Sequence, residues 1–566
     1  MKKILLIYSI FIGLSVMSCA PNKEIVSLDK NSETKSETET AVQNLSEEEL
    51  ISINIKKILD KGVTSRLNFG DQTINFDSSL PAFYSQISYR PAWYDKKGFK
   101  NSKTEELIKT LNSSTLEGLD PNDYNVGIIN KIINTDNYSD IEEISNIDLV
   151  LSSSLLAYSK NLLYGSPKIG KFNFEQPYIE QQINLPLILN KALSQNSLDE
   201  TIDSLKPVSP VYKNLIEALA KYSQIQQIGG WPSIKEGTKL KVGSVDSRVA
   251  ILRRRLIITG DLNQNQNESE IDINSIDNKK SKNPYDKFDL DVENAVKKFQ
   301  QRHNLLADGI VGKSTIDALN ISVEERIRDI KINLNMWRKL PIDLGNKFVL
   351  VNIPFYKLYT FQNNRPFSEM KVVVGKNNWN TPIFSDEISY LEVNPYWNVP
   401  KSILIEDIIP KAKEDPEYIT RNNIKVLRNW ENEHIDDKES YSETDIQNVS
   451  WNEIDTDNWP FRLRQDPGQQ NPLGRLKFMF PNRHNVYLHD TPLKQYFDRT
   501  SRDLSHGCIR VERPLELADF LLYSNPDWSS EQLEYQIKSG RNKIVSLNTP
   551  VPVYLMYFTA WADESD

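Results

Sequence analysis

Apolar residues recur every three or four positions between residues 80 and 230. Leu107, Ile108 and Leu111 form one such run, and a second run extends from Leu151 to Leu163. This spacing places the apolar side chains on one face of a helix, and glycine and proline residues separate the runs. The pattern predicts a mainly helical N-terminal domain over residues 80–230.

Residues 239–320 show the same helical pattern on a smaller scale. Apolar stripes at 249–256 and 292–299 precede a turn at Asp308-Gly309 and a third short helix. Residues 262–287, between the two stripes, are rich in Asn, Asp, Ser and Lys, which is typical of a disordered loop. We therefore expect a three-helix module with a disordered insert.

The pattern changes to alternation in residues 347–558. Strand-like runs occur at 348–350, 357–361, 370–375, 390–393 and 486–489, and this period places successive side chains on opposite faces of a sheet. A polar stretch at about 405–460, rich in charges, interrupts the runs, and we expect it to form an inserted lid. The fold class predicted for the whole chain is multidomain α+β.

The first residues predict export. Lys2 and Lys3 precede a short apolar run, which is too short to span a bilayer. Residues 1–18 are therefore predicted to be a signal peptide, and the Val16-Met17-Ser18-Cys19 run resembles the lipobox of bacterial lipoproteins. The resemblance implies a lipidated Cys19, and the polar residues that follow predict a flexible tether over 19–79. A simple secretion signal that ends beside a cysteine is the alternative.

These features predict a location in the cell envelope. The expected product is a periplasmic lipoprotein held to the membrane by Cys19. Ala20 lacks the aspartate associated with inner-membrane retention, which favours the outer membrane. The formal net charge of -9 argues against nucleic acid as a partner.

Cysteine usage draws attention to one thiol. The chain has two cysteines, so it has no disulfide framework, and lipidation of Cys19 would leave Cys508 unpaired. A lone thiol is either an inert buried side chain or a reactive one. Composition alone leaves both interpretations open.

A nucleophilic thiol needs a base, and His489 lies one strand and one loop earlier in the chain. On a strand, Tyr487 and His489 share one face and Asp490 points away, so Asp490 would orient the imidazole through its backbone carbonyl. Amide groups around Gly507 could stabilise an oxyanion. Zinc held by His484, His489, His506 and Cys508 is the alternative, but the spacing matches no known zinc motif.

Two runs of residues match a known pattern: Tyr487-Leu488-His489-Asp490-Thr491 and Ser505-His506-Gly507-Cys508-Ile509-Arg510-Val511. They resemble the YkuD-type L,D-transpeptidase catalytic domain. Further runs at 394–400, 465–468 and 471–475, together with the helical domain upstream, resemble the long YcbB-like subgroup with its scaffold domain. Residues 299–315 resemble the peptidoglycan-binding-domain-1 family, although each of them could serve packing and turns alone.

The resemblance implies an enzyme with neither cofactor nor metal. Cys508 matches the nucleophile, His489 the general acid/base and Asp490 the residue whose carbonyl holds the imidazole. Tyr487, Ser505, His506 and Arg510 are further candidates for substrate binding, and Arg510 could equally pin its own loop.

The resemblance also implies a substrate and an inhibitor. The substrate would be a peptidoglycan tetrapeptide stem that loses D-alanine, forms a thioester with Cys508 and is transferred to a diaminopimelate amine as a 3-3 cross-link. Peptidoglycan glycan is expected as a partner of the helical module. Acylation of Cys508 by carbapenems is also implied.

Three rival functions were weighed. Papain-like endopeptidases place the cysteine before the histidine, the reverse of the order here. Sortases share the order but lack the Ser-His-Gly-Cys run. A non-catalytic lipoprotein that only binds the wall would show no covalent chemistry at Cys508. The acceptor of the acyl group, whether a stem peptide, a protein lysine, a D-amino acid or water, stays open.

Overall fold

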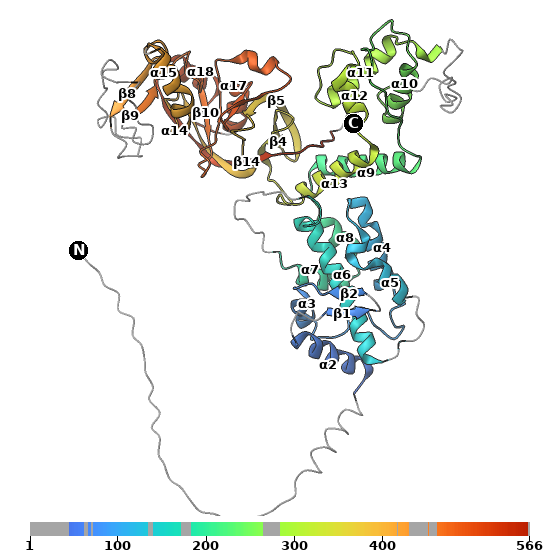
Figure 1. The fold of residues 1–566 in the computed structure, drawn as a ribbon. Helices are drawn as coiled ribbons and strands as arrows, with labels where there is room; N and C mark the ends of the chain where they lie inside the picture. The colour runs from blue at the N-terminus through green and yellow to red at the C-terminus, as the bar shows by residue number, and fades with distance from the viewer. Residues whose placement is uncertain are drawn as a thin grey trace, which may run out of the picture.

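The computed structural model describes residues 45–563 apart from 62–65, 70–71, 134–137, 139, 171–182, 264–283, 416, 429–450, 452–460 and 524. The expected signal peptide, Cys19, most of the 262–287 insert and much of the 405–460 lid therefore lie outside the described residues. A helical part, a small helical module and a β-rich part are visible (Figure 1). The predicted α+β class is confirmed.

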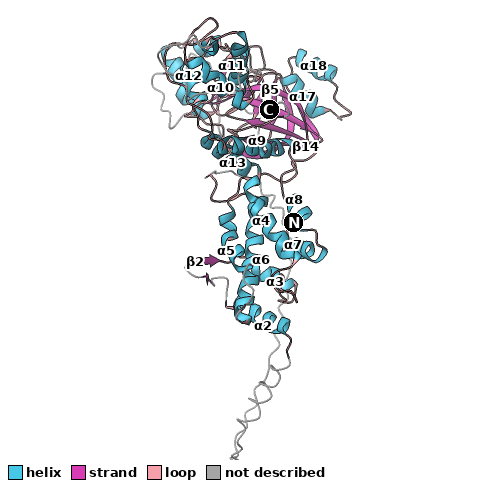
Figure 2. Cartoon of the chain, turned by 90° about the vertical axis from the view of Figure 1, so that its right-hand side faces the viewer, coloured by secondary structure: helices cyan, strands magenta, loops and turns pink. Residues whose placement is uncertain are grey.

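The helical part is built around α6 (Ile141–Tyr164), which is buried along most of its length. Its apolar side chains share one core with the elements around it, and strands lie mainly outside this part (Figure 2). The surrounding elements are α2 (Glu47–Asp60), β1 (Arg66–Phe69), β2 (Gln72–Asn75), α3 (Leu80–Gln86), α4 (Ser102–Asn112), η1 (Ser113–Glu117), η2 (Pro121–Tyr124), α5 (Val126–Ile133), α7 (Leu185–Gln195) and α8 (Leu198–Ser204).

The expectation of a flexible tether over 19–79 is wrong for its C-terminal part. Helix α2 begins after Ser46, whose side chain and that of Glu49 form a reciprocal cap. Ile51, Ile55 and Leu59 are buried in the core of the helical part. These apolar residues are four positions apart, which is the spacing of one face of a helix. The many charged residues between them made the composition look like that of a tether.

Two further helices join the helical part to the β-rich part. Helix α9 (Pro210–Gln227) packs against α13 (Val323–Trp337), and both contribute to a core with strand residues of the β-rich part. Trp337 stacks on Phe558 with ring centres 4.8 Å apart. This shared core anchors the β-rich part on the helices.

The small module contains α10 (Arg248–Thr259), η4 (Pro284–Asp286), α11 (Leu290–Arg302) and α12 (Lys313–Leu319), with its own core, as the three-helix pattern predicted. The Gln300 side chain accepts a hydrogen bond from the Gly309 amide at 2.9 Å and donates to Asp308 at 3.0 Å. Gly309 has φ +72°, and a Cβ there would lie 2.6 Å from Glu293. The Gln300 side chain therefore stabilises the turn at Asp308-Gly309, and the positive φ of Gly309 favours glycine there.

The β-rich part is a nine-stranded sheet in the order β12-β5-β13-β11-β10-β6-β14-β3-β4, and a β4–β5 pairing closes it on itself. Its core-facing side chains form one cluster with α17 and α18. The elements are β3 (Lys347–Asn352), β4 (Lys357–Gln362), β5 (Arg365–Gly375), β6 (Phe384–Val393), β10 (Leu476–Met479), β11 (Leu488–His489), η8 (Lys494–Asp498), β12 (Asp503–Ser505), β13 (Ile509–Val511), α17 (Pro514–Leu522), α18 (Ser530–Lys538) and β14 (Lys543–Met556).

An insertion between β6 and β10 has its own apolar core. Its described elements start before the predicted lid, at Trp397, and extend past its end, to Gln465. It consists of β7 (Trp397–Asn398), α14 (Lys401–Ile403), the π-helix η5 (Leu404–Ile408), α15 (Ile409–Glu414), α16 (Tyr418–Arg421), β8 (Ile424–Arg428) and β9 (Phe461–Gln465), with strand order β7-β9-β8.

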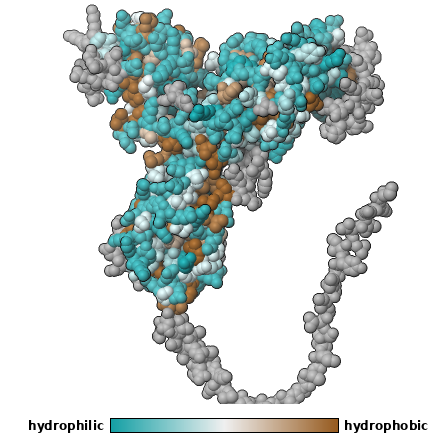
Figure 3. Space-filling model, turned by 180° about the vertical axis from the view of Figure 1, so that it is seen from behind, coloured by the Kyte–Doolittle hydropathy of each residue, from teal (hydrophilic) through white to brown (hydrophobic). Residues whose placement is uncertain are grey.

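The visible surface is mostly hydrophilic, with scattered apolar groups along the helical part (Figure 3). Among the described helices, none is both long and apolar enough to cross a membrane.

Candidate active site

A row of charged and titratable side chains crosses four neighbouring strands of the sheet. Glu392 pairs with Lys477, Lys477 with His489, and His489 with Arg510. Direct cross-strand partners lie on the same face. The alternate residues, among them Leu391, Phe478, Leu488 and Ile509, belong to the core. The row therefore lies on the opposite face of the sheet from the core.

Cys508 joins this face just before β13. Strands β11 and β13 are parallel neighbours, and the Ile509 amide donates to the Tyr487 carbonyl at 3.1 Å. Cys508 lies two residues before Arg510, and Tyr487 two before His489, so alternation places all four on one face. The strand and loop between His489 and Cys508 thus bring the two onto adjacent strands.

The half-buried thiol does not yet contact the imidazole. Cys508 Sγ lies 3.8 Å from the Asn485 carbonyl, and among the described residues no hydrogen bond joins it to His489. Asn482 shapes this loop, since its side chain bonds to Phe480 and Val486. The loop that carries Asn485 therefore forms one side of the surroundings of the thiol.

Asp490 holds the imidazole through its main chain, in the geometry that strand alternation predicted. His489 Nδ1 lies 2.5 Å from the Asp490 carbonyl oxygen. A carbonyl only accepts hydrogen bonds, so Nδ1 carries the proton and Nε2 is the basic nitrogen. The Asp490 carboxylate accepts from the amides of Arg475 and Thr491 and from Lys494, at 2.7–2.8 Å.

Gly474 makes room for this carboxylate, a role that the sequence did not reveal. Its φ is +63°, and a Cβ at this position would lie 2.3 Å from Asp490 Oδ2. Asn471 in the same turn donates to the Pro395 carbonyl at 2.9 Å. The two runs noted at 394–400 and 471–475 therefore support Asp490, and the signal for this role was the glycine within the second run.

Ser505 has a role other than the one expected of it, and it contacts Gly507. The Ser505 hydroxyl donates to the Cys508 carbonyl at 2.6 Å and accepts from the Gly507 amide at 3.2 Å. Ser505 is buried, and Thr381 donates to the Gly507 carbonyl at 2.8 Å. Ser505 thus fastens the nucleophile loop and makes no surface for substrate. The Gly507 amide donates to Ser505 in this structure, and its expected role as an oxyanion donor stays a prediction.

His506 lies at the edge of the site. Its ring meets that of Trp379 edge-on, with centres 5.6 Å apart. Partial burial lowers the pKa of His506, and the nearby charge of Lys376 lowers it further, while Asp407 and Glu406 of the π-helix oppose this. The insertion therefore brings negative charge towards the nucleophile loop.

Tyr487 and Lys477 complete the surroundings of the thiol. Lys477 Nζ lies 4.3 Å from the centre of the Tyr487 ring and 3.8 Å from Glu392. The Tyr487 ring packs against both the core of the sheet and that of the insertion. Tyr487 therefore lies where the two cores meet, next to Lys477. Lys477 carries no motif in the sequence, and reasoning from the sequence missed it.

Burial sets the charge states of the reacting pair. It lowers the pKa of His489 to about 3, with the positive charge of Arg510 acting in the same direction. Burial raises the pKa of the Cys508 thiol, while hydrogen bonds from Tyr487 and the charges of Lys477 and Arg510 oppose the rise. At neutral pH the pair is therefore a neutral thiol beside a neutral imidazole.

Arg510 has unused hydrogen-bonding capacity. Its guanidinium lies over the Tyr496 ring, 5.6 Å from the centre, and its Nη1 is buried with no partner among the described residues. A buried donor without a partner is costly in a folded protein. The atom is therefore available to an acceptor that enters the site.

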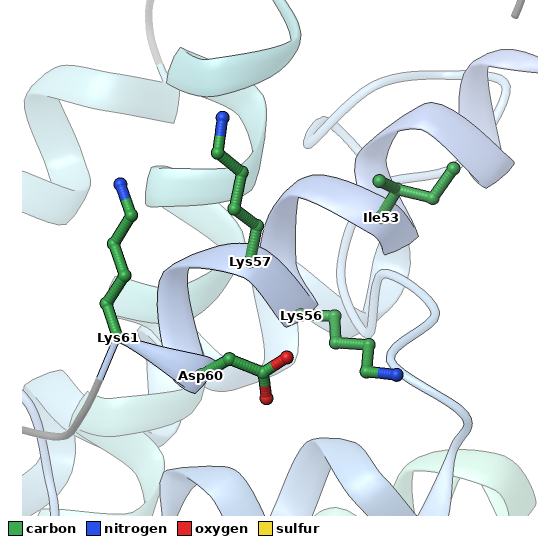
Figure 4. Close-up of a pocket in the computed structure, with 5 residues that line it drawn as sticks. All are labelled: Ile53, Lys56, Lys57, Asp60 and Lys61. Carbon is green, nitrogen blue, oxygen red and sulfur yellow. The ribbon is translucent and has the colours of Figure 1, made fainter. Parts of the chain in front are cut away.

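Two other features of the described residues bear on metal and ligand binding. Within the described residues, no group of three or more His, Cys, Asp and Glu side chains lies together at metal-binding range. A hollow of about 450 Å³ lies beside α2, lined by Ile53, Lys56, Lys57, Asp60 and Lys61. These side chains diverge from one helix (Figure 4), whereas a ligand site needs converging polar groups.

Three family matches follow the three parts of the chain. Residues 78–219 match a scaffold domain, 246–319 a candidate peptidoglycan binding domain, and 346–553 the L,D-transpeptidase catalytic domain, YkuD. The β-rich part is a YkuD-type domain. The site around Cys508 lies within this YkuD match.

A named relative supports the assignment. A protein of Haemophilus influenzae named as a candidate L,D-transpeptidase is 35% identical over 236 residues, 42% of this chain. The match spans 46% of that relative's own length, so it covers less than half of the relative.

Solved structures are more distant. An L,D-transpeptidase (Yku) from Stackebrandtia nassauensis is 13% identical, with a TM-score of 0.21, over 57% of this chain and 96% of that one. One from Mycobacterium smegmatis is 11% identical, with a TM-score of 0.18, over 37% and 58%. The assignment of the YkuD-type domain therefore rests on the sequence matches.

Proposed function

We propose that this protein is a peptidoglycan L,D-transpeptidase that uses Cys508 as nucleophile. The observation that carries the proposal is the Asp490 carbonyl on His489 Nδ1, which leaves Nε2 as a base on the strand beside Cys508. The pair lies in a domain that matches the L,D-transpeptidase family.

In the proposed first step, Cys508 Sγ attacks the carbonyl of the third stem residue while His489 Nε2 takes the thiol proton. The bond between that carbonyl carbon and the D-alanine nitrogen then breaks, and His489 returns the proton to the leaving amine. A thioester remains on Cys508.

In the second step, the side-chain amine of a diaminopimelate residue on another stem attacks the thioester carbonyl. Its proton passes through His489 to the departing thiolate, and a 3-3 cross-link forms. The same route with water as acceptor would give hydrolysis, so the identity of the acceptor is a separate question for the experiment below.

Two groups are suited to negative charge during this chemistry. The free Nη1 of Arg510 offers a donor to a stem carboxylate, which a guanidinium binds well. The amides around Gly507 and Cys508 would donate to the oxyanion, and that of Gly507 would first have to leave Ser505. The insertion would act as a lid over this face, because its core contacts Tyr487.

The other parts of the chain would supply location. The small module would bind the peptidoglycan glycan, supported by its family match. A lipidated Cys19 in the periplasm, more consistent with the outer than the inner membrane, would hold the enzyme near its substrate.

The test is incubation of the protein with disaccharide tetrapeptide, followed by mass spectrometry. Released D-alanine and 3-3 dimers are expected from the wild type and absent from Cys508→Ala. A carbapenem should give a stable mass adduct on Cys508 of the wild type. If the wild type gives no adduct, or Cys508→Ala gives an equal one, the chain is instead a wall-binding lipoprotein without this chemistry.

A further inference from the structure

Lys477 lies at the centre of the charged row, next to the reacting pair. Pairing of β10 with both β6 and β11 places it directly between Glu392 and His489. Its side chain is only 16% exposed, although lysine usually keeps its ammonium group in water. The register of the sheet and the overlying insertion therefore hold a positive charge at a fixed place beside the site.

The contacts of Lys477 lead to the nucleophile through Tyr487. The distance of 4.3 Å from Nζ to the ring centre is in the range of a cation–π interaction. The same ring meets His489 edge-on at 5.7 Å. Tyr487 itself lies beside Cys508, because the Ile509 amide donates to the Tyr487 carbonyl where β11 and β13 pair. One residue thus lies beside the ammonium group, the base and the nucleophile.

We propose that Lys477 is a positioning residue that fixes Tyr487 against the Cys508 sulfur and supplies positive charge that stabilises the thiolate formed when His489 takes the thiol proton. This inference deepens the proposed function and rests on it. The bond changes are those of the first step above, and Lys477 itself neither gains nor loses a proton.

Glu392 carries a charge opposite to that of Lys477, so the two residues should act on the thiolate in opposite directions. Its carboxylate lies 3.8 Å from Lys477 Nζ, on the side away from His489, and partly offsets the lysine charge. The charged and titratable groups that face the sulfur, directly or through Lys477, are Tyr487, Lys477, His489, Arg510 and Glu392. Removing the lysine charge should destabilise the thiolate, whereas removing the glutamate charge should stabilise it. A purely structural ion pair would give changes in the same direction for both.

The experiment measures the rate at which iodoacetamide alkylates Cys508 in the full chain between pH 5 and 10. Peptide mass spectrometry separates Cys508 from Cys19. For Lys477→Met, which keeps the aliphatic stem, we expect the apparent pKa of the thiol to rise by about one unit and alkylation at neutral pH to slow about tenfold. Lys477→Arg should stay near the wild type, and Glu392→Gln should shift the profile to lower pH.

The control is Lys357→Met. Lys357 lies on another strand and pairs with Glu369 at 2.9 Å. The Lys357→Met variant therefore loses an ion pair away from the thiol, and its alkylation profile should match that of the wild type. A wild-type profile for Lys477→Met, or shifts of Lys477→Met and Glu392→Gln in the same direction, would overturn the proposal. If Lys477→Met fails to fold, the direction of the Glu392→Gln shift decides.

Alkylation needs no peptidoglycan, so this result is separate from the proposed function. Shifts of opposite sign in a protein that carbapenems do not acylate would support the role of Lys477 in stabilising the thiolate and refute the transpeptidase. Acylation by carbapenems without those shifts would support the transpeptidase and refute the role of Lys477.

Discussion

The helical part and the β-rich part each bury charged side chains, but they differ in how completely these side chains are hydrogen-bonded. Asp148 on α6 is fully buried, and its carboxylate accepts from the Tyr84 hydroxyl at 2.6 Å and from the amides of Ala92, Trp93 and Tyr94 at 2.9–3.1 Å. Each carboxylate oxygen has two donors.

The site around Cys508 lacks such complete pairing. Arg510 Nη1 has no partner among the described residues, and Cys508 Sγ lies as far as 3.8 Å from the Asn485 carbonyl oxygen. A buried charge with all its partners stabilises a fold, whereas one that lacks partners is costly unless a ligand completes it. The comparison therefore separates a carboxylate whose hydrogen-bond partners are complete from a guanidinium that still has a donor to offer.

The largest expected effect is the loss of the base. His489→Ala should slow carbapenem acylation of Cys508 about 10³-fold, a typical contribution of general acid–base catalysis, and change the thermal unfolding midpoint little. Stopped-flow fluorescence and intact mass give the rate, and circular dichroism gives the midpoint. Equal loss of folding and of acylation would put His489 in the same class as Asp148.

The second effect is a loss of stability at an unchanged acylation rate. Asp148→Ala leaves the amides of Ala92, Trp93 and Tyr94 without their acceptor and should lower the free energy of unfolding by about 3 kcal/mol. The Tyr84 hydroxyl keeps Ser152 and the carbonyl of residue 148 as partners. The acylation rate of the folded protein should stay unchanged. Urea titration followed by circular dichroism measures the loss, and Glu142→Ala, an exposed acid on the same helix, is the control. A slower acylation rate for folded Asp148→Ala would show that the two regions are coupled.

The third effect lies between the two classes. Gly474→Ala forces a methyl group against the Asp490 carboxylate, so the carbonyl that holds His489 should shift. We expect acylation to slow about tenfold, because misplaced catalytic groups lose orientation. Gly468→Ala, where the nearest atom to the new methyl group would lie 4.0 Å away, should behave like the wild type. Identical rates for the two variants would remove Gly474 from the site.

The smallest expected effect concerns pH. His489 has a pKa of about 3, so it stays neutral and basic down to about pH 4 and loses this role only as pH falls further. Acylation of Cys508 should change less than about twofold between pH 5 and 7. A histidine with an ordinary pKa of about 6.5 would lose about twentyfold over the same range. A twentyfold fall would mean that the imidazole is more solvated than its burial indicates.

Much of this site could be predicted because its residues belong to a recognisable motif and also follow the alternating spacing of a strand. The spacing of Tyr487 and His489 on a strand predicted that Asp490 would act through its carbonyl, and the hydrogen bond to Nδ1 has that geometry. The three-helix module and the α+β class followed from periodicity in the same way.

The rest depended on contacts between distant segments. Lys477 alternates with core residues like any solvated lysine, and only the sheet register and the insertion show that it is buried. Ser505 looked like a substrate contact because a hydroxyl in a motif gives no sign that it bonds to its own turn. Helix α2 was hidden because its polar residues outnumber its apolar stripe.

The separate apolar core of the insertion has a consequence for how this chain can diversify. The segment from β7 to β9 folds around its own side chains, while His489 and Arg510 belong to the closed sheet. Substitutions in one can accumulate without unpacking the other. The insertion and the sheet can therefore evolve as two nearly independent units that meet at the Tyr487 ring, which packs against both cores.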